Sequence, residues 1–477
     1  METNATLEVF LNPASVAVIG ASERPGSWGS FITGSLLSGR YPGKLYPVNP
    51  QAEQVFGIPA VGRIEDIEGN IDLAVCAVSE RSIEEIITSC GRKGVRGLSI
   101  ITAGFGEALA GGRAREEKLA ELAGSFGMRL LGPNISGTFN LHEQFIAAGS
   151  PSEHLYPTPL AGVCQGGYAF YDLIAAASFR HMGVGSFVHT GNECDLTVTD
   201  FLEHFGGNEA VKGILMYLET IRDGKRFFEV ARTVTKKKPI VVYKAGRTPA
   251  SARAARSHTG ALAGKAEIYE GFFHQAGIIL SPAMELLVPL GHALIERPPM
   301  KGRRVAVVTV GGSWGVALSD TLEETGLFVP ELSGSLQDLL RSLGMPPRAS
   351  TKNPVDIGAA GFIFSVENLV ELGRVILNSG EVDAMILHGF GRPGMVTEET
   401  PESMRMYAEI EKSVIRGYAA LQEETGFPVL IGSHYAPWES QVIHDLNHEG
   451  IRIFNRLDDT ARLLLLMHRW WEVGCRR

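Results

Sequence analysis

Short apolar runs rich in β-branched residues alternate along the chain with longer amphipathic segments. Between the runs lie segments with charged residues on one face and apolar residues on the other, which is typical of helices. In the first third of the chain the predicted strands are 16–20, 73–78, 98–102 and 129–132, and the clearest predicted helices are 83–93 and 114–126. Runs without polar alternation are typical of strands buried on both faces. The pattern therefore predicts a doubly wound α/β sheet of parallel strands.

The same alternation begins again twice. The second stretch contains predicted strands at 160–164, 213–218 and 239–243 and a predicted helix at 286–295. The third contains predicted strands at 305–310, 384–387, 429–431 and 451–454 and a predicted helix at 458–471. The expected boundaries are residues 150–159 and the segment 296–302, which holds two prolines and a glycine. At about 150 residues per domain, the length of 477 residues also favours three α/β domains, over 1–149, 150–297 and 298–477.

The composition and the charge exclude several classes of protein. Hydrophobic residues make up 44% and charged residues 20%, which fits a globular chain with a sizeable core. The formal net charge of −9 lacks the basic excess of a nucleic-acid binder, so no nucleic-acid partner is expected. No apolar run approaches the length of a membrane span and no signal peptide is visible, so a cytoplasmic location is expected. The five cysteines form no CxxC pair, which argues against a disulfide framework and a zinc site.

Each predicted domain opens with a buried strand that runs into a glycine-rich turn and then a helix. The three turns are 20–29, 164–167 and 311–315. A helix that begins after such a turn exposes free N–H groups and the positive end of its dipole, so it is suited to bind an anion. Any α/β protein needs glycine at such turns, and a single one is explained equally well by backbone geometry. Three of them, one at each domain opening, favour phosphate binding.

The first turn does not match the dinucleotide fingerprint. Its glycines are at 20, 26 and 29 instead of the GxGxxG spacing, and the second strand ends in Leu45–Pro50 with no acidic residue to hold a ribose. NAD is therefore not expected. A wider loop that contains Ser22, Arg24 and Ser27 suits a bulkier phosphorylated nucleotide.

His258 is the candidate catalytic residue of the second domain. It lies in the small-residue run Arg256–Gly264, which follows a strand and leaves room around the imidazole. A neutral imidazole can attack a phosphoryl or acyl group and form a covalent intermediate. Taken alone, one of 13 histidines is more often structural, but its setting at a Gly/Ala-rich helix start favours a chemical role.

Together these residues resemble the alpha subunit of ADP-forming acyl-CoA synthetases, relatives of succinyl-CoA synthetase. The resemblance covers nearly the whole chain, and the His258 segment is its most specific part. The other matching motifs are Val18–Ser22 with Pro25–Ser27, Tyr46–Pro50, Ile101–Glu107, Gly132–Asn134, Gly191–Asn192, Tyr217–Glu219, Gly311–Gly312 and Asn353–Ile357. The resemblance implies an N-terminal Rossmann-like CoA-binding domain followed by two flavodoxin-like domains, of which the first bears the phosphohistidine.

The resemblance also implies roles for particular residues. His258 would carry the phosphoryl group and Glu219 would hold its imidazole, as a triad carboxylate does; a solvated strand-end acid is the alternative for Glu219. Phosphate would be bound at Gln165, Gly166, Gly167, Gly311, Gly312 and Ser313. CoA would be bound by Gly20, Ser22, Arg24, Pro25, Gly26, Ser27, Asn49, Gln51, Ile101, Thr102, Ala103 and Asn134.

The implied reaction interconverts acyl-CoA, ADP and phosphate with a carboxylic acid, CoA and ATP, through acyl phosphate and phosphohistidine. None of the three predicted domains resembles the ATP-grasp fold that the reaction requires. The chain is therefore expected to work with an ATP-grasp beta subunit that binds ATP or ADP with Mg²⁺, in an α2β2 assembly, and to hold no metal of its own. The substrate would be a small carboxylic acid.

Several positions depart from the family pattern. Cys164 and Gly166 stand where the family usually has serines, Gln51 replaces a lysine, and Ile135 replaces a cysteine near the expected thioester. The third turn differs from the family's usual Gly-Gly-Pro-Gly in its second half, where this chain reads Gly312-Ser-Trp-Gly315. These changes suggest an unusual acyl substrate or a weakened activity. A catalytically weakened CoA-binding or regulatory protein is the alternative reading, and acyl or carbamoyl transfer on the same scaffold is a second one. Cys164 at a helix start is also a minor candidate nucleophile.

Overall fold

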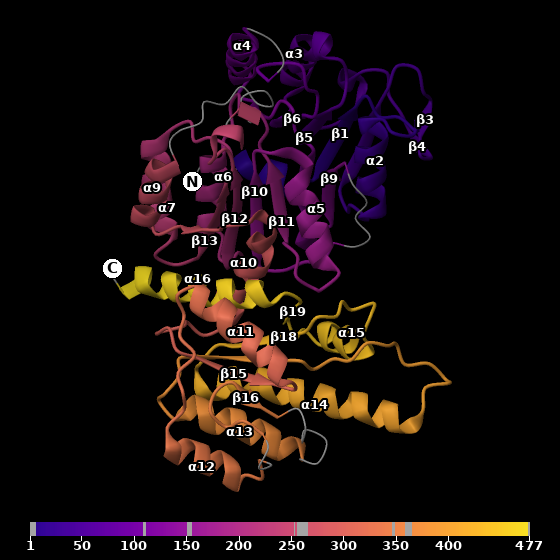
Figure 1. The fold of residues 1–477 in the computed structure, drawn as a ribbon. Coiled ribbons are helices and arrows are strands. Elements are labelled where there is room, and N and C mark those ends of the chain that lie inside the picture. The colour runs from indigo at the N-terminus through magenta and orange to yellow at the C-terminus, as the bar shows by residue number, and fades with distance from the viewer. Residues whose placement is uncertain are drawn as a thin grey trace. The chain divides into compact units, whose positions relative to one another are not determined.

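The computed structural model describes residues 6–107, 111–149, 155–251, 253–254, 266–345, 349–357 and 365–475. The chain divides into two compact units. The first unit comprises Met1–Ser178 and Gly183–Gly291, and the second comprises Phe179–Met182 and His292–Arg477. Among the described residues, the first unit contains two large sheets and a two-stranded one, and the second unit contains one large sheet, so each of the three predicted α/β stretches has a large sheet (Figure 1).

The first sheet has five parallel strands in the order β2-β1-β5-β6-β7. They are β1 Ser15–Ile19, β2 Lys44–Val48, β5 Leu73–Cys76, β6 Gly97–Ile100 and β7 Arg129–Leu131. Alternate residues of β1 belong to different clusters of the core, with Val16 and Val18 on one face and Ala17 and Ile19 on the other. Both faces are thus covered, and this explains why the sequence of β1 is apolar after Ser15. A short hairpin of β3 Gln54–Val55 and β4 Ile58–Pro59 follows β2.

The second sheet has seven strands in the order β14-β13-β12-β10-β11-β8-β9. They are β8 Gly137–Asn140, β9 Phe145–Ala148, β10 Leu160–Cys164, β11 Ser186–His189, β12 Gly213–Leu218, β13 Ile240–Lys244 and β14 Ile279–Leu280. The hairpin β8–β9 is antiparallel and pairs with β11. Residues 137–148, expected in the first domain, therefore belong to this second sheet. Phe139 faces Phe187 across the strand pair, with ring centroids 5.4 Å apart, and this stacking fastens the hairpin to the sheet.

The third sheet lies in the second unit and has five parallel strands in the order β16-β15-β17-β18-β19. They are β15 Val305–Thr309, β16 Val355–Asp356, β17 Ala384–His388, β18 Val429–Gly432 and β19 Ile453–Phe454. The parallel strands of each sheet, counted in chain order within that sheet, are arranged 2-1-3-4-5. The prediction of doubly wound α/β sheets is confirmed. In such sheets ligands bind at the carboxyl edge, where the strand order reverses beside the first strand.

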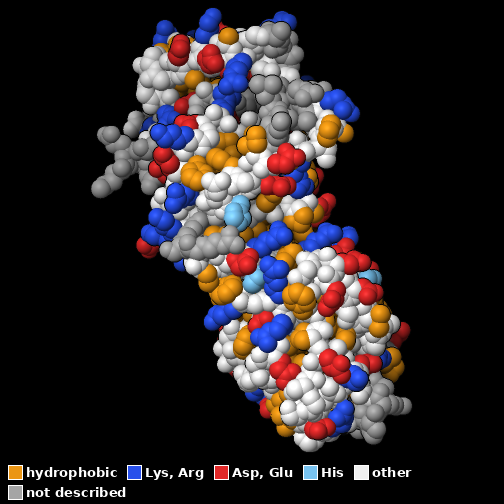
Figure 2. All heavy atoms as spheres, turned by 60° about the vertical axis from the view of Figure 1, so that its left-hand side comes forward, with side chains coloured by type: hydrophobic (Ala, Val, Ile, Leu, Met, Phe, Trp, Pro, Cys, Tyr) orange, Lys and Arg blue, Asp and Glu red, His pale blue; other side chains and the backbone are white. Residues whose placement is uncertain are grey.

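The helices connect the parallel strands. Those of the first unit are α2 Trp28–Ser38, α3 Ile83–Lys93, α4 Gly112–Gly124, α5 Gly167–Ser178, α6 Val198–Gly207, α7 Gly224–Val234 and α9 Ala266–Ala276, and α10 Leu287–Glu296 leads into the second. Those of the second unit are α11 Gly312–Glu324, α12 Gly334–Ser342, α13 Val366–Asn378, α14 Glu402–Thr425, α15 Gln441–His448 and α16 Leu457–Cys475. Of the described helices, none is long and apolar enough to cross a membrane. On the face drawn in Figure 2, acidic and basic side chains of the described residues are interspersed.

Candidate functional site

A pocket of about 390 Å³ lies at the carboxyl ends of β1, β2 and β5, beside the point where the strand order reverses. Gly20, Asn49 and Gln51, which are predicted CoA residues, line it. Gly20 has φ +88°, and a Cβ there would come within 2.7 Å of the Ala77 carbonyl oxygen, so glycine is required at this bend. The Asn49 amide donates to the Ala21 carbonyl at 2.8 Å. This bond ties the end of β2 to the first turn.

The rest of the first turn lies at the surface. Arg24, Pro25 and Gly26 are exposed. The Ser22 hydroxyl accepts from the Arg24 N–H at 3.0 Å, and Ser27 caps α2 by accepting from the Ser30 N–H at 3.3 Å. Both serines thus shape the turn that precedes the helix.

A second pocket, of about 320 Å³, brings together residues predicted for two different ligands. Ile101, Thr102, Ala103 and Asn134 of the predicted CoA set line it together with Gly167 of the predicted phosphate turn. The remaining lining residues are Trp28, Ala77, Val78, Ile135, Ser136, Tyr168 and His189. Val78 lines both pockets, which are therefore adjacent along the same sheet edge. The lining is mostly apolar, with few polar groups, as is usual for a small-molecule site.

The predicted phosphate turn between β10 and α5 is tied to the strands beside it. The side-chain oxygen of Gln165 accepts from the N–H groups of Glu219 and Thr220, at 2.8 and 3.0 Å. The Gln165 side chain thus connects the turn to the end of β12. A Cβ on Gly166 would lie 2.1 Å from Cε1 of Tyr217, so the tyrosine ring occupies the space that a side chain would need. Gly167 has φ +55° and begins α5.

His189, at the end of β11, is a residue of this site that the sequence analysis missed. It is 4% exposed, and its two ring nitrogens meet the phosphate turn on one side and Ser136 on the other. The Ser136 N–H lies 2.7 Å from Nδ1, and the Gly167 N–H and the Gln165 carbonyl lie 3.0 and 3.1 Å from Nε2. Only its place two residues before the motif Gly191–Asn192 could have drawn attention to it.

Glu219 lies at the end of β12 and is 9% exposed, so the alternative of a solvated acid does not describe it. The Lys244 ammonium donates to the Glu219 carbonyl at 2.7 Å and lies 4.4 Å from the centroid of the Tyr269 ring. Burial lowers the pKa of Lys244 to about 8, against the opposing effect of the Glu219 charge. His258 itself lies outside the described residues.

Three motifs noted in the sequence meet at Asn192. Its amide donates to Glu107 and, at 2.7 Å, to Glu116, while its side-chain oxygen accepts from Asn134 at 3.2 Å. Arg222 donates to the Asn192 carbonyl. Asn192 therefore connects the 101–107 loop, the 132–134 turn and the loop that follows β11.

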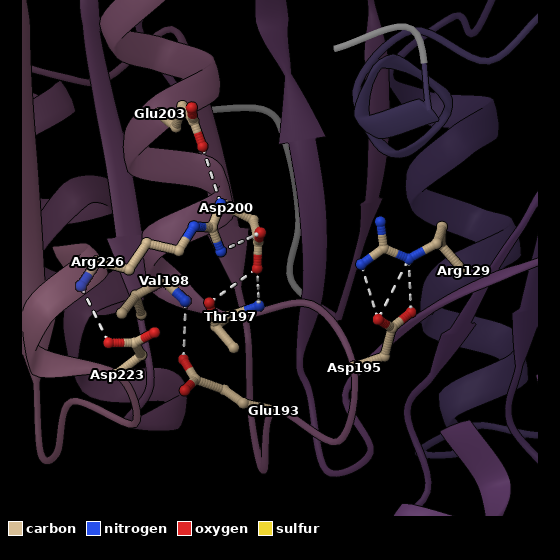
Figure 3. Close-up of polar contacts among 9 residues, drawn as sticks. All are labelled: Arg129, Glu193, Asp195, Thr197, Val198, Asp200, Glu203, Asp223 and Arg226. Carbon is tan, nitrogen blue, oxygen red and sulfur yellow. Dashed lines mark hydrogen bonds and ion pairs between the residues drawn. The ribbon is translucent and has the colours of Figure 1, made fainter. Parts of the chain in front are cut away.

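The loop after β11 is held by a network of charged groups (Figure 3). Asp195 forms a bidentate pair with Arg129, with its shortest distance 2.7 Å, and accepts from the Leu130 N–H at 2.8 Å. The carboxylate of Glu193 is 2% exposed and accepts from the Thr190 hydroxyl and the Val198 N–H at 2.9 and 3.0 Å. Burial raises the pKa of Glu193. The sequence analysis did not single out Glu193.

The third turn begins α11 in the second unit. Gly312 and Ser313 are exposed, and a Cβ on Gly312 would lie 3.1 Å from Oδ2 of Asp356, so a carboxylate stands beside this helix start. Trp314 lies between two imidazoles, with its ring centroid 4.8 Å from that of His388 and 5.2 Å from that of His434. Burial, and then the charge of His434, lower the pKa of His388 to about 4, which keeps it neutral at pH 7.

No group of three or more His, Cys, Asp or Glu side chains suited to hold a metal ion occurs within the described part of the chain. The turn between β10 and α5 leads directly into a helix. The free N–H groups at a helix start suit the binding of an anion, because they stabilise its charge without fixing it to one residue.

Comparison with known proteins agrees with this geometry. A CoA binding domain model matches residues 14–138, and a model described as succinyl-CoA ligase like flavodoxin domain matches residues 157–294. These matches place the chain in a class of α/β proteins that combine a CoA-binding domain with a ligase-type flavodoxin domain.

Among the relatives are two alpha subunits from Pyrococcus furiosus. The chain is 39% identical to the alpha subunit of acetate–CoA ligase [ADP-forming] I over 98% of its own length and 99% of the relative, and 36% identical to that of enzyme II over 80% and 81%. A solved dinucleotide-forming acetyl-coenzyme A synthetase 1 from Candidatus Korarchaeum cryptofilum, in complex with phosphate and ADP, has a TM-score of 0.83 and 31% identity and covers 99% of this chain and 98% of that one. The chain belongs to the family of alpha subunits of ADP-forming acyl-CoA ligases, as the resemblance predicted.

Proposed function

We propose that this chain catalyses the acyl-transfer and phosphohistidine steps by which acyl-CoA, ADP and phosphate are interconverted with a carboxylic acid, CoA and ATP. The observation that carries the proposal is the 320 Å³ pocket. Within one unit it is lined by Ile101–Ala103 and Asn134, the proposed CoA residues, and by Gly167 of the proposed phosphate turn. A thioester and a phosphate held in one pocket are placed to react with each other.

The chemistry proceeds in three transfers. An oxygen of phosphate attacks the thioester carbonyl, the C–S bond breaks, and the CoA thiolate leaves and takes up a proton. The His258 imidazole then attacks the phosphorus of the acyl phosphate, and the P–O bond breaks to release the carboxylate. A terminal oxygen of ADP finally attacks the phosphohistidine, which breaks the P–N bond and forms ATP. Glu219, buried beside the turn, orients the imidazole and stabilises its positive charge.

The proposed sites divide between the two units. CoA binds along the edge of the first sheet at Gly20, Ser22–Ser27, Asn49, Gln51, Ile101–Ala103 and Asn134. The phosphoryl group is held by the turn Gln165–Gly167, where Gln165 acts as a brace, and at a second station by Gly311, Gly312 and Ser313. Its relatives are named alpha subunits, which supports a beta subunit as partner. An ATP-grasp beta subunit in an α2β2 assembly supplies the ADP site, and Mg²⁺ accompanies the nucleotide there.

The phosphohistidine is tested by labelling. The chain is incubated with its partner subunit, Mg²⁺ and ATP labelled in the γ-phosphate, and the protein-bound label is assayed for acid lability and base stability. Wild type and His274→Ala, a change of an exposed histidine on α9, should carry the label, and His258→Ala should not. Label that survives in His258→Ala at the wild-type level would overturn the proposal. CoA binding without phosphate-dependent release of CoA from any acyl-CoA would favour the weakened CoA-binding protein instead.

A further inference from the structure

A pocket of about 430 Å³ lies at the amino edge of the third sheet, and all the residues that line it belong to the second unit. They include Val429, the first residue of β18, and Ile451 and Arg452, which come directly before β19. Residues of α14 and of the end of α10 complete the lining. The third glycine turn follows β15 and therefore lies at the opposite, carboxyl edge of the same parallel sheet. The pocket is thus separate from the predicted phosphate sites.

Arg297 lines this pocket, and its buried charge has little to balance it. The side chain is 5% exposed, and its one ion pair among the described residues is with Glu296, whose Oε2 lies 3.7 Å from Nη1. Nε and Nη1 are enclosed and meet no hydrogen-bond acceptor in the part of the chain that the structure describes. The Phe454 ring, with its centroid 5.2 Å from Cζ, adds a cation–π contact. A buried charge is costly unless it is paired and hydrogen-bonded, so Arg297 calls for a further anion.

Glu296 does not supply that anion alone, because it is shared. Its Oε1 lies 2.7 Å from Nδ1 of His292 and 3.3 Å from Nε of Arg452, so both are closer to the carboxylate than Arg297 is. Burial opposes the ionisation of Glu296 most, but the His292 hydrogen bond and the charges of Arg452 and Arg297 lower its pKa. Burial lowers the pKa of Arg297 to about 10, against the charge of Glu296, so the guanidinium stays charged at pH 7. One carboxylate thus faces two guanidinium groups.

The other charged residues of the lining lie towards the solvent. Arg416 and Glu449 are both exposed and pair with each other at 2.6 Å, and Glu423 is exposed as well. Water screens exposed charges, so these three act weakly on the buried end of the pocket. The charges of the lining balance as a whole, but its buried end, where Arg297 and Arg452 face Glu296, is positive.

The remaining walls of the pocket are largely apolar. Ala419 and Ala420 on α14, Val429 and Ile431 on β18, and Ile451 contribute to them. Val429 and Ile431 belong to the core of the second unit, so this wall is held in place by packing. A positive end beside apolar walls suits a ligand with one anionic head and an apolar body. Planar guanidinium groups match the geometry of a carboxylate.

We propose that this pocket binds a small monocarboxylate with an apolar body, whose carboxylate meets the guanidinium groups of Arg297 and Arg452 and whose body lies against the walls from α14 and β18. The carboxylate supplies the negative charge that Glu296 provides only in part. Inorganic phosphate also binds guanidinium groups, but it has no apolar body to use the walls. The inference goes beyond the proposed function, because it assigns a second ligand site at the other edge of the third sheet.

The first test locates the ligand by NMR. Spectra of the full chain with ¹³C-labelled isoleucine methyl groups are recorded during titration with hexanoate, with hexanamide as its uncharged counterpart, and with inorganic phosphate. The two reporter signals are assigned by their loss in Ile431→Val and Ile451→Val. Hexanoate should shift both signals until they saturate, and hexanamide and phosphate should leave them in place. Absence of a shift with hexanoate, an equal shift with hexanamide, or a shift with phosphate alone overturns the proposal.

The second test removes the buried charge. In Arg297→Met the dissociation constant of hexanoate, read from the Ile451 signal, should rise by about ten- to a hundredfold. Arg341→Met, which changes an exposed arginine on α12, is the control and should bind hexanoate as wild type does. Without hexanoate, Arg297→Met should melt at a higher temperature than wild type, because methionine needs no counter-charge. If Arg297→Met does not fold, Arg297→Gln is titrated in its place.

The melting temperatures give an independent reading of the same site. Saturating hexanoate should raise the melting temperature of wild type more than that of Arg297→Met, because a ligand stabilises only the form that binds it. An equal rise in the two proteins, or an unchanged dissociation constant in Arg297→Met, overturns the proposal. Neither test measures catalysis, so failure of the proposed function would leave this site standing, and failure of this site would leave the proposed function untouched.

Discussion

The ring of Tyr217 occupies the space beside Gly166, and this packing makes a quantitative prediction. A Cβ at position 166 would lie 2.1 Å from Cε1 of Tyr217 and 2.8 Å from Cδ1 and Cζ. Ordinary carbon contacts lie at about 3.5 to 4.0 Å, so the deficit is about 1.5 Å. The ring is confined, because it stacks on Tyr243 with centroids 5.8 Å apart and belongs to the central strand β12. Gly166→Ala should therefore lower the free energy of unfolding by about 1–3 kcal/mol, the usual range for overpacking.

A double-mutant cycle with Tyr217→Ala isolates this contact. Tyr217→Ala alone is destabilising because it removes a half-buried ring. In the Tyr217→Ala background, Gly166→Ala should cause almost no further loss of unfolding free energy. The coupling energy should therefore be close to the cost of Gly166→Ala in the wild-type background. The assay is urea unfolding followed by circular dichroism. Gly271→Ala, on the exposed face of α9 with nothing within 4 Å of its Cβ, is the control and should raise stability by about 0.5–1 kcal/mol. Equal destabilisation by Gly166→Ala with and without the Tyr217 ring would refute the reasoning.

Three further predictions concern other parts of the chain. Burial raises the pKa of the Cys164 thiol, so at pH 8 a thiol reagent should modify the exposed Cys475 first and leave Cys164 unmodified until the chain unfolds; rapid labelling of Cys164 would revive the view of it as a nucleophile. Burial is the largest effect on the Asp445 carboxyl and opposes its ionisation, but hydrogen bonds from Lys412, His444 and Gln441 lower its pKa to about 2. The stability that the charged form of Asp445 contributes is present above about pH 4 and is lost towards pH 2. Asp445→Asn should therefore flatten this part of the acid-unfolding profile. Asp195→Ala should lower the free energy of unfolding by about 1–3 kcal/mol, since its carboxylate serves Arg129 and the Leu130 N–H, whereas Glu117→Ala at the exposed Arg113–Glu117 pair should change it by less than about 0.5 kcal/mol in the same urea titration.

The strands of the parallel sheets were predictable because burial on both faces leaves a plain sequence signal. The run predicted at 213–218 is β12 without change, and those at 98–102 and 305–310 differ from β6 and β15 by one or two residues. The antiparallel hairpin β8–β9 was not predicted, because its partner β11 pairs with residues 46 to 50 positions earlier in the chain. The pairing depends on the stacking of Phe139 on Phe187, which no local pattern reports.

Some features of the candidate site were predictable from the sequence, and others were not. The turns at Gly20 and Gly167 were found because a glycine bend before a helix is a local pattern, and both have positive φ. The direction of the Gln165 side chain was not predictable, since it is set by N–H groups of β12's end, more than 50 residues away. His189 was missed for a similar reason. Its environment is assembled from Ser136, Gln165 and Gly167, and only the folded chain brings these residues to one imidazole.

The departures from the family pattern at Cys164 and Gly166 can be judged by what surrounds them. Loss of a side chain without compensation leaves a cavity or polar groups without partners, and both are destabilising. Here the ring of Tyr217 fills the space beside Gly166, and Cys164 is fully buried with its carbonyl accepting from the Thr190 N–H at 2.8 Å. The imidazole of His189 stands at the same turn with its hydrogen-bonding groups directed at Gln165 and Gly167. A turn that is repacked in this way is the pattern expected of an altered site, and it argues against simple decay of the predicted phosphate turn.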